Sequence, residues 1–226
     1  MLAAGRSEVH TDSPVRDAGT SNHMPNAIHH LMHSAKSELL ITNAYIIPDA
    51  SFMADLRELA GRGVTVRILT NSLASHDVPA VNSHFEQWRE PILETGAELY
   101  ELRPDAAIRG ELADIAPLRA EFVGLHTKAM VIDRRRAFVG SMNLDPRSQI
   151  LNSEMGVLID SPLLAEKLAE RMLRDMAGDN SWQVIRADDG TLRWRSSAGE
   201  LTSQPARSLS QRMQNVLFKA FPVDLY

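Results

Sequence analysis

Apolar residues in the first hundred positions follow two different repeats, which predict alternating strands and helices. Short apolar runs are typical of buried strands. They occur at 39–43, 64–70 and 97–102. Between them, apolar residues recur every three or four positions, as on one face of a helix. These segments are 25–36, 50–62 and 79–95. Such alternation is typical of α/β layering, so we expect a mixed, largely parallel sheet flanked by helices.

Beyond residue 103 the alternation is less regular. Segment 103–119 has no clear period, and we expect a loop there. The charged residues 133–136 form a predicted turn between two strands. Ser161-Pro162 is a favourable helix start, and Asp189-Gly190 a favourable hairpin turn. The elements expected in this half are strands at 126–132, 137–142 and 152–159, a helix at 161–178, a hairpin at 182–194 and a helix at 208–221.

Three regions are expected along the 226 residues. Residues 1–23 are polar and small, typical of a flexible lead-in. Residues 24–178 hold the predicted sheet and helices, and their number suits a single core. Residues 179–226 are expected to form a hairpin and helix tail packed on that domain.

Composition limits where the protein acts. The formal net charge is −5, which argues against general polyanion binding. The absence of cysteine excludes disulfides and thiolate metal sites. No apolar run approaches the ~18 residues of a membrane-spanning helix, and the N-terminus lacks the apolar core of a signal peptide. We therefore expect any membrane contact to be peripheral, and on the cytoplasmic side.

Chemically active residue types gather between residues 124 and 143. Side chains two apart on a strand share a face, so His126 and Lys128 are expected to point the same way. Ser141 and Asn143 share a face in the next segment. If the two strands pair, an imidazole, an ammonium, a hydroxyl and a carboxamide converge. An imidazole can act as nucleophile or acid, and Lys128, Ser141 and Asn143 can bind phosphoryl oxygens.

Two carboxylates accompany this set. Glu154 lies on a neighbouring predicted strand, where it is expected to orient His126 through the second ring nitrogen. Asp133 is an odd number of positions from His126, so a regular strand turns it to the opposite face. We therefore expect Asp133 to have a structural role at the strand end, paired with an arginine.

The spacing His-x-Lys-x4-Asp-x6-Gly-Ser-x-Asn, starting at His126, resembles the motif of the phospholipase D superfamily. The resemblance implies a phospholipase D-like layered fold and a catalytic set of His126, Lys128, Asp133 and Glu154. The stretches 143–148 and 152–156 are similar to those of bacterial cardiolipin-synthase-type members. Upstream, 43–48, 70–72 and 96–100 resemble the second half of those enzymes. The implied activity is phosphatidyl transfer on phospholipids through a phosphohistidine intermediate, without metal or cofactor.

Those enzymes carry two copies of the motif, and this chain carries one that resembles the second. The family mechanism then makes His126 the general acid and assigns the nucleophile to the first copy. We expect either a missing N-terminal half that supplies it, or a homodimer in which His126 takes both roles. Two alternatives stay open: a single-motif nuclease acting as a homodimer, and an inactive half-domain. The acidic charge argues against a nucleic-acid partner.

The remaining candidates have ordinary interpretations. Tyr45 and Asn71 follow strands, where α/β sites often form, so they are candidate site-wall residues. The three arginines at 134–136 are expected to be a solvated turn, and Trp182, Trp194 and Phe221 to be core or docking residues. Several histidines have no ligand-like partner in the sequence and are expected to be ordinary surface or packing residues. They are His29, His30, His33, His76 and His84.

Overall fold

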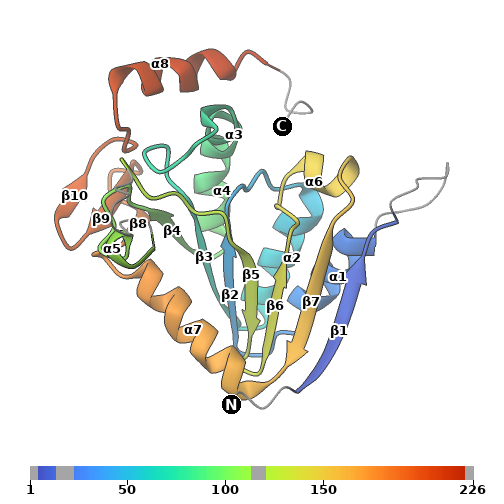
Figure 1. The fold of residues 1–226 in the computed structure, drawn as a ribbon. Helices are drawn as coiled ribbons and strands as arrows, with labels where there is room; N and C mark the ends of the chain where they lie inside the picture. The colour runs from blue at the N-terminus through green and yellow to red at the C-terminus, as the bar shows by residue number, and fades with distance from the viewer. Residues whose placement is uncertain (1–4, 14–22, 113–120, 222–226) are drawn as a thin grey trace.

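A computed structural model of the protein describes residues 5–13, 23–112 and 121–221, and ten strands of this part form one sheet (Figure 1). The strand order is β1-β7-β6-β5-β2-β3-β4-β8-β9-β10. The strands are β1 (Arg6–Thr11), β2 (Glu38–Asn43), β3 (Thr65–Asn71), β4 (Glu98–Leu102), β5 (Lys128–Ile132), β6 (Arg136–Gly140), β7 (Met155–Asp160), β8 (Ser181–Arg186), β9 (Leu192–Ser196) and β10 (Gly199–Leu201). The helices are α1 (His23–His33), α2 (Ala50–Gly61), α3 (Pro79–Phe85), α4 (Arg89–Glu94), α5 (Arg109–Leu112), α6 (Pro146–Ile150), α7 (Pro162–Met176) and α8 (Leu209–Phe218), with one 3-10 turn, η1 (Glu86–Trp88).

The sheet is mixed and flanked by helices, as predicted, but the expectation that it is largely parallel was wrong. Among the described strands only the pairings β2–β3 and β3–β4 are parallel, and the other seven are antiparallel. A parallel pair needs a long crossover, which α2 and the α3–α4 segment provide. The later strands are joined by a tight turn at 133–135, a short excursion through α6 and two hairpin-like turns. These connections give antiparallel neighbours.

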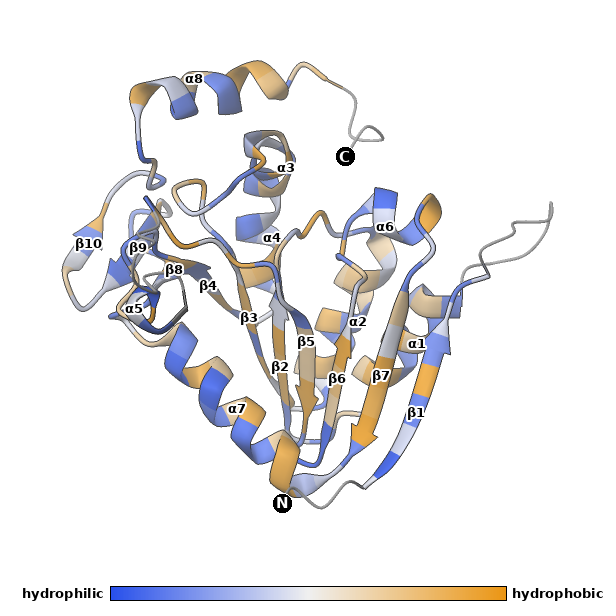
Figure 2. Ribbon diagram, in the orientation of Figure 1, coloured by the Kyte–Doolittle hydropathy of each residue, from blue (hydrophilic) through white to orange (hydrophobic). Residues whose placement is uncertain are grey.

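Alternating residues of β2 supply two hydrophobic layers. Leu39 and Ile41 pack into the larger cluster with residues of α1 and α2, while Leu40 packs on the other face with Ala165 and Ala169 of α7. Figure 2 shows β6 and β7 as largely apolar and α7 as striped, which is the pattern of a helix with one face on a sheet. Both faces of the central strands are therefore covered by apolar layers.

The helix predicted at 79–95 is divided into α3, η1 and α4. Pro91 lies in the first turn of α4 and has no backbone N–H to donate to the preceding turn. The apolar spacing still holds across the break, because Val81, Phe85 and Ile92 are all buried. The break therefore changes the local geometry and keeps the packed face.

Residues 6–11 form strand β1 and are not a flexible lead-in. β1 pairs antiparallel with β7 from Arg6↔Asp160 to Thr11↔Met155. Its side chains are mostly exposed, so its sequence lacks the apolar alternation that predicts a strand. Backbone hydrogen bonds to β7 supply the pairing. The other residues of the predicted lead-in that lie at 1–4 and 14–22 are outside the described part.

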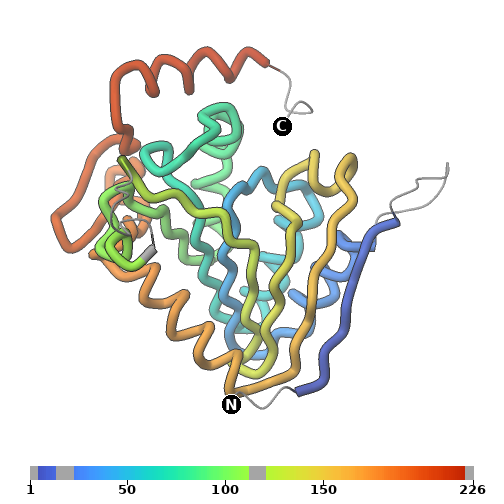
Figure 3. The backbone as a smooth tube through the Cα atoms, viewed as in Figure 1, coloured from blue at the N-terminus to red at the C-terminus, as the bar shows by residue number. Residues whose placement is uncertain are grey.

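The C-terminal elements extend the sheet and then cross above it. Gly190 has φ +79 in the turn between β8 and β9, as the predicted Asp-Gly turn requires. Trp182 and Trp194 are buried in the core. Figure 3 follows the backbone from α7, past the β8–β9 hairpin, to α8, which crosses over α3 at the opposite end of the molecule from the turn at 133–135. The carboxyl ends of β2 and β3 lie at the same end of the molecule as α8 (Figure 1).

Candidate active site

The predicted site residues other than Asp133 gather where β2 and β3 end and β5 begins. Asn43, the last residue of β2, pairs with Lys128, the first of β5. One strand further, Gly140 of β6 pairs with Gly156 of β7, which brings Ser141 and Glu154 to the same edge. This edge is the carboxyl end of the parallel strands, the usual place for a site in an α/β sheet.

His126 and Lys128 form a close pair, although His126 precedes β5 and does not belong to it. The Lys128 ammonium donates to the His126 carbonyl oxygen at 2.9 Å and lies 3.2 Å from His126 Nδ1. Because an ammonium only donates, this contact places a lone pair on Nδ1 and, in the neutral ring, the proton on Nε2. The His126 side chain is exposed. Its Nε2 is therefore accessible to a substrate, and the ring can act as a general acid when both nitrogens carry protons.

Lys128 is a buried cation among acidic groups. Lys128 is 7% exposed, and this burial lowers the pKa of its ammonium. The nearby carboxylates of Glu154, Asp145 and Asp77 act in the opposite direction. The ammonium also lies 5.7 Å from the centre of the Tyr45 ring. A compact charge held in this way is ready to meet the oxygens of a phosphodiester.

Glu154 is hydrogen-bonded to neighbours other than His126. Its carboxylate accepts from the Ser141 hydroxyl and, at 3.1 Å, from Asn152 Nδ2. Within the described residues, no hydrogen bond joins Glu154 to His126, so the expected orienting contact is not seen. Ser141 is the nearer donor because it follows β6 directly beside the start of β7. Ser141 Oγ also accepts from the Met155 N–H at 3.1 Å.

The N-terminal strand holds Glu154 in place. Asp12 is buried, and its carboxylate accepts from the Glu154 N–H at 3.1 Å and from the Met24 N–H at 2.8 Å. The Asp12 N–H in turn donates to the Glu154 carbonyl oxygen at 2.8 Å. β1, α1 and the start of β7 are thus joined at one carboxylate beside the site.

Asn143 lies at the site with an unsatisfied amide. Its Oδ1 is buried without a hydrogen-bond partner in the described structure. The two ends of an amide are assigned only through their hydrogen-bond network, and a flip would present two N–H donors at the same place. An unpaired polar group that follows β6 at this end of the sheet is suited to a substrate oxygen.

Asp133 lies at the other end of β5, far from the rest of the predicted set. Its carboxylate accepts from the backbone N–H groups of Lys36, Ser37 and Glu38 at 2.8–3.1 Å. These contacts lower the pKa of Asp133 against the effect of its burial. Asp133 therefore joins the start of β2 to the β5–β6 turn and is not brought to the site. The expected arginine partner is replaced by backbone amides.

Tyr45 and Asn71, the predicted wall residues, both contact the site. The Tyr45 hydroxyl donates to Asp77 Oδ1 at 2.8 Å, and its ring stacks on His76 at 5.1 Å. Burial and this bond raise the pKa of Tyr45. Asn71 bonds both polar groups of Leu125, the residue before His126.

Asp145 and Asn43 are site residues that the sequence analysis did not single out. Asp145 caps α6 by accepting from the Ser148 N–H at 2.7 Å. Burial raises the pKa of Asp145, with the charge of Glu154 adding to the rise and that of Lys128 opposing it. Asn43 donates to the Met142 carbonyl oxygen at 3.2 Å and so fixes the segment that carries Asn143. Asp145-Pro146 is a helix-start pair like Ser161-Pro162, so the sequence did contain a local signal for Asp145.

Comparisons with known proteins agree with this arrangement. The family model described as "Cardiolipin synthase, PLD-like domain" matches residues 28–176. Cardiolipin synthase C of Escherichia coli is 33% identical over 221 residues, which cover 95% of this chain and 46% of that protein. A cardiolipin synthase of Clostridium perfringens is 28% identical over 159 residues, covering 70% of this chain and 29% of its own length.

Solved structures share the fold. Nuc, a phospholipase D family member from Salmonella typhimurium, superposes with a TM-score of 0.54 at 20% identity, covering 77% of this chain and 97% of its own. Phosphatidylserine synthase from Haemophilus influenzae superposes with a TM-score of 0.55 at 17% identity, covering 80% of this chain and 41% of its own. The chain thus spans less than half the length of the curated relatives it matches. Within the described residues, no helix has the length and apolar character to cross a bilayer.

Proposed function

Because the chain belongs to the family of cardiolipin synthase, PLD-like domains, we propose that it forms one half of a phosphatidyl-transferring site. The observation that supports this most directly is the grouping of His126, Lys128, Ser141 and Glu154 at one exposed end of the sheet. Phosphodiester chemistry needs a proton donor and a fixed cation, and His126 and Lys128 supply them.

The proposed reaction has two displacements. A partner imidazole attacks phosphorus, and the bond to the leaving alcohol's oxygen breaks as that oxygen takes the Nε2 proton of His126, which enters this step as an imidazolium and leaves it as a neutral ring. An incoming alcohol then returns a proton to His126 while its oxygen displaces the imidazole from phosphorus. Lys128 and Asn143 are placed to bind the non-bridging oxygens. With phosphatidylglycerol as both donor and acceptor, the products are cardiolipin and glycerol.

The attacking imidazole must come from outside this chain, because one imidazole cannot be nucleophile and acid in the same step. We propose that a preceding half of the protein, or a second copy of this chain, supplies it. The share of the curated relatives that the chain covers, 46% for cardiolipin synthase C, supports the first source.

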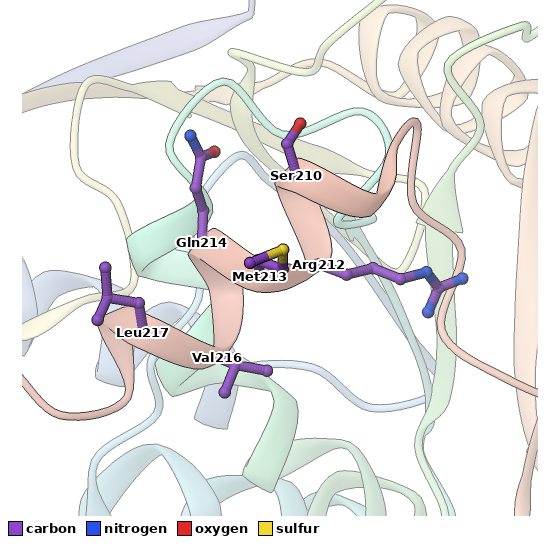
Figure 4. Close-up of a pocket in the computed structure, with 6 residues that line it drawn as sticks. All are labelled: Ser210, Arg212, Met213, Gln214, Val216 and Leu217. Carbon is purple, nitrogen blue, oxygen red and sulfur yellow. The ribbon is translucent and has the colours of Figure 1, made fainter.

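We further propose that α8 contacts the lipid surface. Its polar residues Gln211 and Asn215 face the protein and bond Leu73, Asn82 and Glu86. Its apolar residues face outward, a reversal of the usual arrangement. Leu209, Met213, Val216 and Leu217 are each between 62% and 79% exposed. Figure 4 shows three of these apolar side chains, together with Arg212, along one stretch of the helix.

Charge and position favour a lipid surface as the occupant of this face. Residues 207–221 contain Arg207, Arg212 and Lys219 and no acidic residue, which suits an anionic bilayer. α8 is also attached to the wall of the site: Gln211 donates to the Leu73 carbonyl oxygen at 2.6 Å, and Arg207 to that of His76 at 3.1 Å. A substrate drawn from the bilayer would enter beside it.

The direct test uses the purified full chain with phosphatidylglycerol vesicles, followed by glycerol release and cardiolipin formation. We expect turnover in the wild type at concentrations where light scattering detects a dimer, or on addition of the preceding half. His126→Gln should abolish it without unfolding the protein, since this side chain is exposed. Equal turnover in both proteins would exclude the proposal.

A homodimeric nuclease is the second candidate, because the chain matches Nuc over 97% of that protein's length. It predicts salt-sensitive DNA binding and DNA cleavage lost in His126→Gln. The acidic net charge and the apolar outer face of α8 favour the lipid substrate. Cleavage of DNA with no turnover of vesicles would reverse this preference.

A further inference from the structure

Two histidines one helical turn apart converge on a buried carboxylate between α1 and α2, which lie side by side (Figure 1). His29 Nδ1 is 2.8 Å from one oxygen of Asp55, and His33 Nε2 is 2.8 Å from the other. The three groups' ligand atoms lie within 4.8 Å of one another, and Asp55 is only 4% exposed. The expectation that these histidines lack ligand-like partners was wrong, because their partner comes from a different helix.

A second carboxylate holds one of the imidazoles from behind. His33 Nδ1 lies 3.0 Å from Glu58 Oε1, one turn beyond Asp55 on α2. Metal-binding histidines commonly donate their second ring nitrogen to a carboxylate in this way, which fixes the ring and directs its other nitrogen at the ion. Without an ion, His33 can donate to both carboxylates only as an imidazolium.

The cluster also has space and access. His29 and Asp55 line a cavity of about 40 Å³, enough for water ligands beside an ion. The His29 side chain is 45% exposed, which leaves a path from solvent. Two imidazoles and one carboxylate with a remaining open position form a donor set that Zn²⁺ uses in proteins.

We propose that His29, His33 and Asp55 bind a divalent transition-metal ion of the Zn²⁺ class, with Glu58 positioning His33. The ion would cross-link the C-terminal half of α1 to α2. None of these residues belongs to the phosphodiester site, so the inference is independent of the proposed function.

The test uses the full chain without an affinity tag of histidines, stripped with a chelator. Zn²⁺ is titrated by calorimetry and Co²⁺ by visible absorption, and we expect one ion per chain. His29→Gln and His33→Gln should each weaken binding more than about 100-fold, and Glu58→Gln by about 10–100-fold. His30→Gln is the matched control, since His30 is exposed on the same helix outside the cluster, and it should bind as the wild type does.

Thermal unfolding gives a second measurement. Zn²⁺ should raise the midpoint of the wild type and of His30→Gln, because an ion that binds only the folded chain stabilises it, and should leave that of His33→Gln unchanged. Absence of saturable binding to the wild type, or binding that survives in both His29→Gln and His33→Gln, would show a plain ion-paired cluster and overturn the proposal.

Discussion

Asn71 binds Leu125 through both ends of its amide. Its Oδ1 accepts the Leu125 N–H at 2.8 Å, and its Nδ2 donates to the Leu125 carbonyl oxygen at 2.9 Å and to that of Ala44 at 3.1 Å. Leu125 precedes His126, and His126 lies outside any strand. A buried side chain at the end of β3 therefore fixes the backbone that presents the proposed acid.

Replacing Asn71 with alanine should lower turnover more than it lowers folding stability. The loss of buried hydrogen bonds should cost about 1–3 kcal/mol in the free energy of unfolding. Turnover should fall about 10–100-fold, since a misplaced catalytic group loses rate steeply. Urea unfolding and vesicle turnover measure the two effects.

Asn180 offers a matched control for that variant. It is also buried, and it makes a similar double contact, with the Ile108 N–H at 3.0 Å and the Arg174 carbonyl oxygen at 2.8 Å. Asn180→Ala should destabilise the protein comparably and leave the turnover of the folded protein unchanged. An equal loss of turnover in both variants would mean that Asn71 has no special positioning role.

Lys128 should give stability a characteristic pH dependence. Burial lowers the pKa of Lys128 in the folded protein below the ordinary 10.5. Between this lowered pKa and 10.5, the folded chain therefore holds fewer protons than the unfolded chain. The free energy of unfolding from this group therefore rises with pH across that window. Lys128→Met should remove the rise, which urea unfolding from pH 7 to pH 10.5 can measure. Identical slopes in the two proteins would contradict the prediction.

A buried ion pair holds the α3–α4 segment against the sheet. Arg89 Nε lies 2.5 Å from Glu101 Oε1, Trp194 donates to the other oxygen at 2.9 Å, and both charged side chains are almost fully buried. Arg89→Met should cost about 3–5 kcal/mol, because it leaves a buried carboxylate without a cation. Arg89→Met with Glu101→Leu should recover part of this loss, since the buried Trp194 N–H then loses its acceptor. Arg186→Met, which breaks an exposed pair with Glu94, should cost less than about 1 kcal/mol.

The outer face of α8 should determine binding to vesicles. Met213→Ser combined with Leu217→Ser should weaken binding to phosphatidylglycerol vesicles at least about 100-fold, because each buried apolar side chain contributes about 1.5–3 kcal/mol and about 1.4 kcal/mol corresponds to a tenfold change. Stability should hardly change, since both side chains are exposed. Gln214→Ser on the same helix should bind as the wild type does. Sedimentation with vesicles makes the comparison, and unaltered binding by the double variant would exclude this face.

Periodic and local signals predicted most of the described helices and strands. The charged residues 133–136 and the Asp-Gly pair at 189–190 predicted the β5–β6 and β8–β9 hairpins, and Ser161-Pro162 marked the start of α7. β1 was not predicted, because backbone pairing to β7 stabilises it and such pairing requires no hydrophobic repeat in the sequence. Strand direction was misjudged for a related reason: it depends on connections more than on the strands' own residues.

The site was predictable where it depends on spacing along the chain. Lys128 lies beside His126, as the motif implies. Glu154 accepts from Ser141, a contact that the sequence analysis did not predict. Contacts across long separations were not predictable, among them Asn71 with Leu125 and Asp55 with His33. The partners of Asp133 could not be predicted, because they are backbone amides about 95 positions away and any non-proline residue can supply such an amide.

The carboxylate of Asp12 has a practical consequence for anyone trimming this protein. The segment that matches the family model begins at residue 28, and a minimal domain cut to that segment would discard Asp12 and β1 together. The backbone of Glu154 would then lose the acceptor of its N–H and the donor to its carbonyl oxygen, and the sheet would gain an open edge at β7. Such a shortened domain would retain every motif residue yet have a loosened glutamate, and a poor rate from it would reflect the missing strand.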